Sequence, residues 1–230
     1  MELRLVGSEM CIRDRIVREI KTLNDQAELT TIFTEKSVDF INLNKDNPFF
    51  LYVPHPMPHV PIAVSKKFLG KSEQGLYGDL MMEIDWSVGR IINALEQNKI
   101  IDNTLIIFTS DNGPWLNFGN HAGSTGGLRE GKGTSFEGGQ RVPTVMMWPD
   151  VIPPGKIANQ LSSAIDILPT VSHIVDGNLP KHKIDGINIM EILKGEKVNP
   201  RKEFYYYYGN NNLEAVRKDN WKLILPHNSR

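Results

Sequence analysis

Apolar residues follow two different spacings along this chain, and their order predicts a fold class. They recur at helical spacing in residues 16–47 and again, over about five turns, in residues 77–95. Continuous apolar runs without polar alternation are typical of strands covered on both faces of a parallel sheet. Such runs lie at residues 49–53, 105–110 and 142–148. With a further helix at residues 164–175, the alternation predicts an α/β protein with a doubly wound, mostly parallel sheet.

The texture of the sequence changes near residue 179, where the segments become short and polar. Residues 204–208 and 221–225 have the pattern of antiparallel strands. We therefore expect two parts: an incomplete α/β domain at residues 16–178, and a smaller α+β subdomain with an antiparallel sheet at residues 179–230.

The first fifteen residues differ from the rest, because they show neither an apolar period nor helix caps. Residues 8–15 resemble the translated adapter found at the ends of some assembled reading frames. We expect residues 1–15 to be a non-native or disordered tail and the chain to be a fragment. A natural, poorly ordered terminus is the alternative.

Composition narrows the function classes. The chain has 230 residues, 40% of them hydrophobic, with 26 basic and 27 acidic side chains. This balance argues against a nucleic-acid binder or a polybasic membrane-surface protein. No apolar run approaches the ~20 residues needed to span a bilayer. The single cysteine, Cys11, excludes an intramolecular disulfide.

The candidate chemistry begins where the run at 105–110 ends, at Asp111 and Asn112. Ligands of parallel α/β sheets bind beyond the carboxyl ends of the strands. Carboxylate and amide oxygens are hard ligands of the kind that bind calcium or magnesium. The alternative is a plain Asx turn, since Asp-Asn-Gly-Pro is strong turn chemistry.

Two further candidates lie in loops that follow predicted strands. His59 stands in a proline-rich loop after residues 49–53, and Lys132 stands in a glycine-rich loop at residues 113–141. An oxygen-bound cation, a lysine and a histidine in one crevice would suit an anionic tetrahedral substrate. Spacing alone is not specific, because these residue types are common in loops.

The local strings are more specific, and together they resemble the sulfatase family over residues 28–225. They are PFFLY at 48–52, PHVP at 58–61, TSDNG at 109–113, LREGKGTSFEGGQRVP at 128–143, DILPT at 166–170, AVR at 215–217 and WKL at 221–223. The resemblance implies a type I sulfatase, with an alkaline-phosphatase-like fold, that hydrolyses sulfate esters with calcium and a formylglycine.

The resemblance also implies roles for single residues. Asp111 and Asn112 match two metal ligands, for calcium or alternatively magnesium. Lys132 would bridge the sulfate and the aldehyde hydrate, and His59 would contact the sulfate and assist the leaving group. We read other polar residues as structural: His55 and His121 as pocket-edge or loop residues, Arg141 as an ion-pair partner of Glu137, and Asp85 as a helix surface residue.

One departure from the family pattern limits what this chain does alone. The family nucleophile is a formylglycine made from Cys or Ser in a Cys/Ser-x-Pro/Ala-x-Arg motif. Residues 11–15 have the Cys and Arg spacing, but Arg13 stands where Pro or Ala belongs. We therefore expect the formylglycine upstream of this chain. Two oxygen ligands also fall short of a calcium shell of about six to eight.

Two other functions stay open. One is a phosphatase, phosphonate hydrolase or phosphodiester hydrolase of the same superfamily, and the other is a non-catalytic carbohydrate-binding fragment. For the sulfatase we expect a sulfated small molecule or sulfated carbohydrate as partner, with no nucleic acid and no membrane span. The resemblance implies a secreted, periplasmic or lysosomal location. The sequence leaves the oligomeric state unknown.

Overall fold

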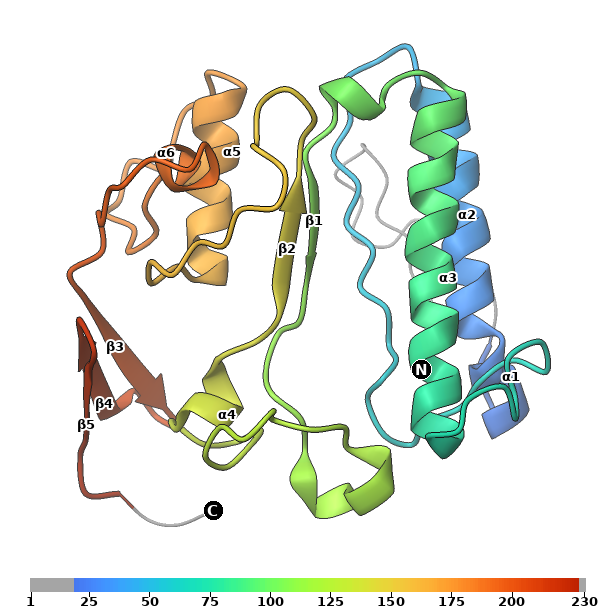
Figure 1. Ribbon diagram of the computed structural model, residues 1–230, viewed down its shortest axis with the longest axis horizontal. Helices are drawn as coiled ribbons and strands as arrows, with labels where there is room; N and C mark the ends of the chain where they lie inside the picture. The colour runs from blue at the N-terminus through green and yellow to red at the C-terminus, as the bar shows by residue number, and fades with distance from the viewer. Residues whose placement is uncertain (1–18, 228–230) are drawn as a thin grey trace. The chain divides into compact units, whose positions relative to one another are not determined.

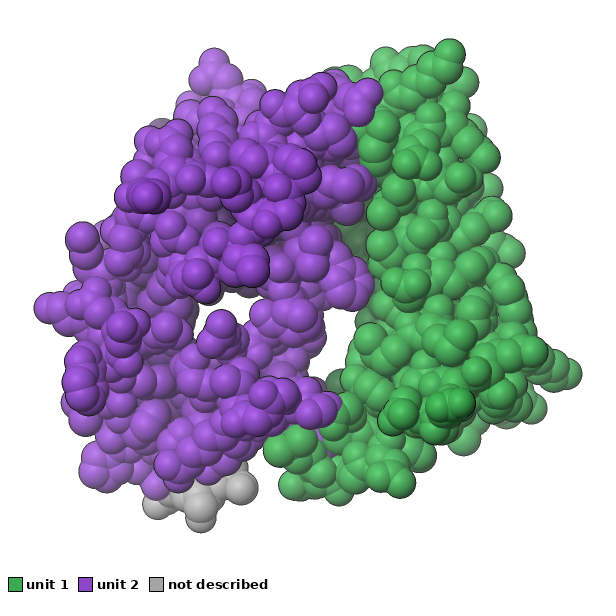
Figure 2. Space-filling model, in the orientation of Figure 1, with its two compact units in different colours: residues 1–101, 116–123 green, residues 102–115, 124–230 purple. Residues whose placement is uncertain are grey.

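The computed structural model describes residues 19–227, and the chain divides into two compact units. Unit 1 comprises residues 1–101 and 116–123, and unit 2 comprises residues 102–115 and 124–230 (Figure 2). The tail predicted at residues 1–15 lies outside the described residues. The domain boundary predicted between residues 178 and 179 stays a prediction.

Two long helices dominate unit 1; they pack side by side and run in the same direction (Figure 1). The helical spacing in the sequence is confirmed in both. A capping box starts the unit: the Thr22 hydroxyl accepts from the Asp25 amide at 3.2 Å, and the Asp25 carboxylate accepts from the Thr22 amide at 2.9 Å. The helices are α1 (Leu23–Ala27), α2 (Leu29–Asn44), α3 (Gly75–Gln97) and the 3-10 helix η2 (Leu116–His121).

The prediction of a strand at residues 49–53 is wrong within the described part of the chain. The segment is extended but assigned to no strand. Its side chains alternate, since Phe50 and Tyr52 are 67% and 70% exposed, while Phe49 contacts the Phe40 ring edge-on at 5.6 Å between centroids. A strand requires a hydrogen-bonded neighbour as well as an extended backbone, and residues 19–227 provide none here.

Polar side chains are buried on the same face of α3 that buries its apolar residues. Glu83 is fully buried, and its carboxylate accepts from the Thr31 hydroxyl at 3.1 Å and the Ser65 amide at 3.0 Å. One turn before it, Asp79 accepts from the Gly70 amide at 2.7 Å and the Ser72 amide at 2.6 Å. The bonds from Ser72 and Gly70 lower the pKa of the Asp79 carboxyl. These carboxylates bind the loop before α3 to the helix.

Beside them, His55 packs into the interior of unit 1. Its Nε2 lies 3.1 Å from the Ser87 hydroxyl, and its ring centroid lies 5.9 Å from that of Phe33. Its Nδ1 is buried and has no hydrogen-bond partner among the described residues. Burial lowers the pKa of His55 from 6.5 to about 4.

This histidine makes the stability of unit 1 depend on pH. Between about pH 6.5 and 4 the unfolded chain binds a proton at His55 that the folded chain does not. The free energy of unfolding is therefore expected to fall as pH drops through this window, by on the order of 3 kcal/mol. Urea unfolding at a series of pH values measures it. His55→Gln should flatten this part of the curve, and His182→Gln, at an exposed loop histidine, should not. An unchanged slope in His55→Gln would contradict the assignment.

Unit 2 begins with a two-stranded sheet formed by β1 (Ile106–Thr109) and β2 (Thr144–Met147). This pair is antiparallel, with Ile106 opposite Met147 and Thr109 opposite Thr144, and it is an exception to the mostly parallel sheet that the sequence predicted. Parallel neighbours need a crossover that returns to the starting end. Here the glycine-rich connection stays at the carboxyl end of β1 and enters β2 beside it.

The sheet is also less covered than the apolar runs predicted. Phe108 and Val145 are 37% and 63% exposed. The short helices of unit 2 are η1 (Ile101–Asn103, begun at the last residue of unit 1), α4 (Glu137–Gln140), η3 (Ala164–Asp166), α5 (Ile167–Ile174) and α6 (Met190–Leu193).

The C-terminal part of unit 2 holds the predicted antiparallel sheet. Its strands are β3 (Glu203–Tyr208), β4 (Asn212–Lys218) and β5 (Trp221–Ile224), in the order β3-β4-β5 (Figure 1). The first and last strands are confirmed, whereas β4 was not expected as a strand. Its sequence NLEAVRK mixes charged and apolar residues because Glu214 points into the interior, where it is 2% exposed.

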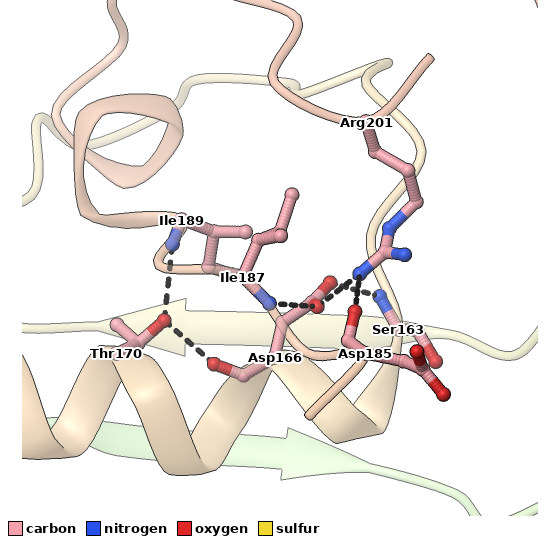
Figure 3. A network of polar contacts seen from close by, with 7 residues as sticks. All are labelled: Ser163, Asp166, Thr170, Asp185, Ile187, Ile189 and Arg201. Atoms are coloured by element: carbon pink, nitrogen blue, oxygen red, sulfur yellow. Dashed lines mark hydrogen bonds and ion pairs between the residues drawn. The ribbon is translucent and has the colours of Figure 1, made fainter. Parts of the chain in front are cut away.

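A buried carboxylate connects the start of α5 to segments that follow it in sequence (Figure 3). Asp166, fully buried, accepts from the Ser163 amide at 2.8 Å and the Ile187 amide at 2.9 Å, and it forms an ion pair with Arg201. Arg201 also donates to the Asp185 carbonyl at 3.4 Å. Because removing one partner leaves a buried charge uncompensated, this network fixes the chain before β3 against α5.

Candidate functional site

The candidate site is built at the carboxyl end of β1, where the backbone turns at Asp111 and Asn112. The Ser110 hydroxyl donates to the Asn112 carbonyl at 3.0 Å and closes the turn. Asp111 is exposed and Asn112 is half-buried. The turn is thus closed by a serine hydroxyl, and the Gly113 amide that an Asx turn at Asp111 would use bonds to the Gly139 carbonyl instead.

The turn is bonded directly to the glycine-rich loop. The Gly113 amide donates to the Gly139 carbonyl at 3.0 Å, and the Gly138 amide donates to the Arg129 carbonyl at 2.9 Å. A Cβ on Gly113 would collide with the Gly138 carbonyl, and a Cβ on Gly138 would collide with the Glu130 carbonyl. Only glycine permits backbones to approach this closely.

The same contact positions Lys132. Its amide donates to the Pro114 carbonyl at 2.8 Å, so its backbone is tied three residues beyond Asp111. Its side chain is half-buried, with Nζ 5.2 Å from the centroid of the Trp115 ring. The structure therefore brings Asp111, Asn112 and Lys132 into one backbone-bonded assembly within unit 2.

The C-terminal sheet holds this loop through two acidic side chains. The Ser135 hydroxyl donates to the buried carboxylate of Glu214 at 2.8 Å. Glu137 pairs with Lys222 at 2.9 Å and with Arg217 at 3.2 Å. Burial lowers the pKa of Lys222, and its bond to Glu137 opposes the shift. The loop is thus anchored just before α4 and at its first residue.

These contacts correct one prediction. The ion-pair partners of Glu137 in the described part of the chain are Arg217 and Lys222, not Arg141. Arg141 is exposed and instead donates its backbone amide to the Glu137 carbonyl at 2.8 Å.

The remaining predicted residues belong to unit 1. His59 is exposed, with Nδ1 2.7 Å from the Val60 carbonyl. Its participation in a site with Lys132 stays a prediction. His121 and Asp85 are exposed. His55 lies in a loop as predicted, but its contacts are with the interior of unit 1.

Sequence reasoning missed the residues that support the site. They are Trp115 beside Lys132, and the pair Ser135 and Glu214, which lie 79 residues apart along the chain. No local period connects them. The signal that could have found Glu214 is its place between two apolar residues in a short strand, where an acid must find a partner if it is buried.

The donor chemistry of Asp111 and Asn112 fits a calcium or magnesium ion, since both provide hard oxygens. Within residues 19–227, no group of three or more His, Cys, Asp or Glu side chains could hold a metal ion. The pair would therefore form part of a coordination shell. No helix in this part of the chain has the length and apolar character that crossing a membrane requires.

Comparison with known proteins identifies the family. Residues 10–177 match the sulfatase family, and residues 131–228 match the family described as N-sulphoglucosamine sulphohydrolase, C-terminal. The chain therefore belongs to the sulfatase family.

Curated relatives agree with this assignment. Human steryl-sulfatase is 39% identical over 195 residues, which cover 82% of this chain and 33% of that protein. The N-acetylgalactosamine-6-sulfatase of Canis lupus familiaris is 39% identical over 185 residues, 79% of this chain and 35% of that protein. The chain thus spans about a third of the length of these relatives.

Solved structures confirm the alkaline-phosphatase-like α/β fold. The PsFucS1 sulfatase from Pseudoalteromonas sp. matches 91% of this chain and 43% of its own, with 29% identity and a TM-score of 0.84. Ps i-CgsB in complex with k-i-k-neocarrahexaose matches 85% of this chain and 45% of its own, with 30% identity and a TM-score of 0.73.

The close approach of the two backbones can be tested by adding a single methyl group. Gly113→Ala should force the glycine-rich loop off the Asp111 turn, because the new Cβ collides with the Gly138 carbonyl rather than a flexible side chain. Amide hydrogen exchange should then speed up at Lys132, whose amide bonds to the Pro114 carbonyl. Gly89→Ala is the matched control, since a Cβ there meets nothing within 4 Å. Unchanged protection of Lys132 in Gly113→Ala would show that the contact does not hold the loop.

Proposed function

We propose that this chain is the carboxyl-terminal part of a calcium-dependent sulfatase that hydrolyses sulfate esters. One observation carries the proposal: the Gly113–Gly139 and Lys132–Pro114 backbone bonds place the candidate metal ligands and the candidate lysine in one assembly. In a member of the sulfatase family, this assembly would combine a cation and an ammonium group at one site. Both would neutralise oxygen charge on a sulfate.

Each residue would have a separate task. Asp111 and Asn112 would provide two oxygen ligands to calcium, or to magnesium as the second choice, and further ligands would come from outside the described residues. A formylglycine, when present in the longer protein, would supply the nucleophile that attacks sulfur. Lys132 would hold a sulfate oxygen, and His59 would give a proton to the leaving oxygen as the S–O bond breaks.

A sulfated carbohydrate is the favoured substrate class. One similar curated protein is named for an N-acetylgalactosamine-6-sulfate activity, and one similar solved structure contains a carrageenan-type hexasaccharide. Steryl-sulfatase is named for a different alcohol, so a sulfated small molecule stays the alternative. The location proposed with this function is secreted, periplasmic or lysosomal.

Asn112 favours this function over a phosphatase, phosphonate hydrolase or phosphodiester hydrolase. An amide oxygen is a hard ligand that suits calcium, whereas a histidine at this position would suit zinc. A purely non-catalytic carbohydrate-binding role is less well supported, because Lys132 remains half-buried against Trp115 beside the ligand pair.

Activity measurements test the proposal. The 230-residue chain should not turn over an aryl sulfate, and a longer protein containing it and the nucleophile motif should. In that longer protein, Lys132→Ala should lower kcat/KM at least about a hundredfold, as expected for a lost transition-state charge contact. Lys183→Ala, at an exposed loop lysine, is the control. Calcium-dependent turnover by the short chain, or full activity in Lys132→Ala, would disprove the assigned roles.

Metal titration tests the ligand pair independently of activity. In the longer protein, calcium should raise the melting temperature by mass action. Asp111→Ala should abolish this shift, and Asn112→His should move the preference toward zinc, because nitrogen replaces a hard oxygen. Asn103→His, at an exposed asparagine, should leave calcium binding unchanged. Equal calcium affinity in all variants would mean that the strand end is only a turn.

A further inference from the structure

A second cationic feature of unit 2 lies outside the assembly around Lys132. It is a cavity of about 520 Å³, within the size range of pockets that bind small ligands. Three loops surround it: residues 157–161, residues 197–202 before β3, and residues 217–220 where β4 turns into β5. We call it the β3 cavity.

The lining of the β3 cavity is strongly polar, with more basic than acidic side chains. It has four cationic side chains, one carboxylate, four carboxamides and three aliphatic residues, and no aromatic residue. In that order the residues are Lys197, Arg201, Lys202 and Arg217; Asp219; Asn159, Gln160, Asn199 and Asn220; and Ile157, Leu161 and Val198.

Existing ion pairs do not cancel this positive charge. Arg201 is neutralised by Asp166, which also fixes its guanidinium at the wall (Figure 3). Arg217 forms an ion pair with Glu137, and the same carboxylate also forms an ion pair with Lys222. One negative charge therefore faces two positive charges. Lys197 and Lys202 are exposed and form no ion pair within residues 19–227. The positive charge that remains in the cavity therefore exceeds the single negative charge of Asp219.

The side chains define the chemistry of a suitable ligand. Ammonium and guanidinium groups bind sulfate and carboxylate oxygens through charge-assisted hydrogen bonds. Carboxamides both donate and accept, which suits sugar hydroxyls. The absence of an aromatic wall disfavours nucleobases, which bind by stacking.

We propose that the β3 cavity is a non-catalytic binding site for an acidic oligosaccharide, held by Lys197 and Lys202 through its sulfate groups and by the carboxamides through its hydroxyls. The site goes beyond the proposed sulfatase function and does not depend on it. Because Arg217 lines the cavity and bonds to Glu137 in α4, the site is connected to the loop that carries Lys132.

Calorimetry with the complete 230-residue chain and a heparin-derived hexasaccharide tests the proposal. Binding should weaken as salt is raised, because exposed charges are screened. The double variant Lys197→Ala/Lys202→Ala should weaken binding at least about tenfold, as expected for lost charge-assisted bonds. Lys181→Ala/Lys183→Ala removes the same charge from exposed positions outside the cavity and should bind like the wild type. Asn159→Ala/Asn199→Ala provides a second, charge-neutral variant, which should also bind more weakly.

Three results would overturn the proposal. Wild-type chain that does not bind the hexasaccharide would exclude the site. Equal loss in the two lysine double variants would mean that only overall charge matters. Loss of binding in Lys132→Ala, with full binding in Lys197→Ala/Lys202→Ala, would assign the sugar to the candidate sulfatase site instead. Lys132→Ala thus separates the failure of this proposal from the failure of the proposed function.

Discussion

The candidate site depends on the direct contact between two backbone segments, the turn after β1 and the glycine-rich loop. The Gly113 amide bonds to the Gly139 carbonyl, and the Lys132 amide bonds to the Pro114 carbonyl. Neither segment is part of a sheet or a long helix, so these bonds replace the ladder that would otherwise order them. A side chain at Gly113 would collide with the Gly138 carbonyl and separate the segments. The contact that holds the candidate ligand pair beside the loop of the candidate lysine therefore requires glycine at this position.

Buried and half-buried acidic side chains connect this loop to the rest of unit 2. Glu214 receives the Ser135 hydroxyl from one side of α4, and Glu137 receives Arg217 and Lys222 from the sheet. A buried or half-buried charge is costly unless it is paired, so each contact strongly disfavours arrangements in which the loop leaves the sheet. Asp166 has the same function just before β3, through Arg201. The three-stranded sheet is thus linked by charge to both its flanking segments.

Much of the fold could be predicted because it depends on local periods. The helical spacing of α3 and the apolar run that contains β1 each lie within one segment. Features that depend on distant partners could not be predicted. The apolar run of a strand carries no information on which strand pairs with it. The strand predicted at residues 49–53 and the antiparallel direction of the β1–β2 pair therefore differ between sequence and structure. Glu83 bonds to Thr31 of α2, and His55 lies against Ser87 of α3. Such contacts between distant segments leave no periodic signal in the sequence. The candidate residues themselves were predictable, since strand-end turns and glycine-rich loops are local features.

Near-neutral net charge excluded polyanion binding only for the molecule as a whole. With 26 basic and 27 acidic side chains, the sequence averages to almost zero, but the structure distributes these charges unevenly. Several acids are used in the interior, where Asp79, Glu83 and Glu214 accept hydrogen bonds from neutral amides and hydroxyls. Among the residues that line the β3 cavity, four cationic side chains face one carboxylate, Asp219. We therefore expect a positive local potential there despite the balanced composition, because a potential near the surface depends on the charges within about a Debye length, ~8–10 Å.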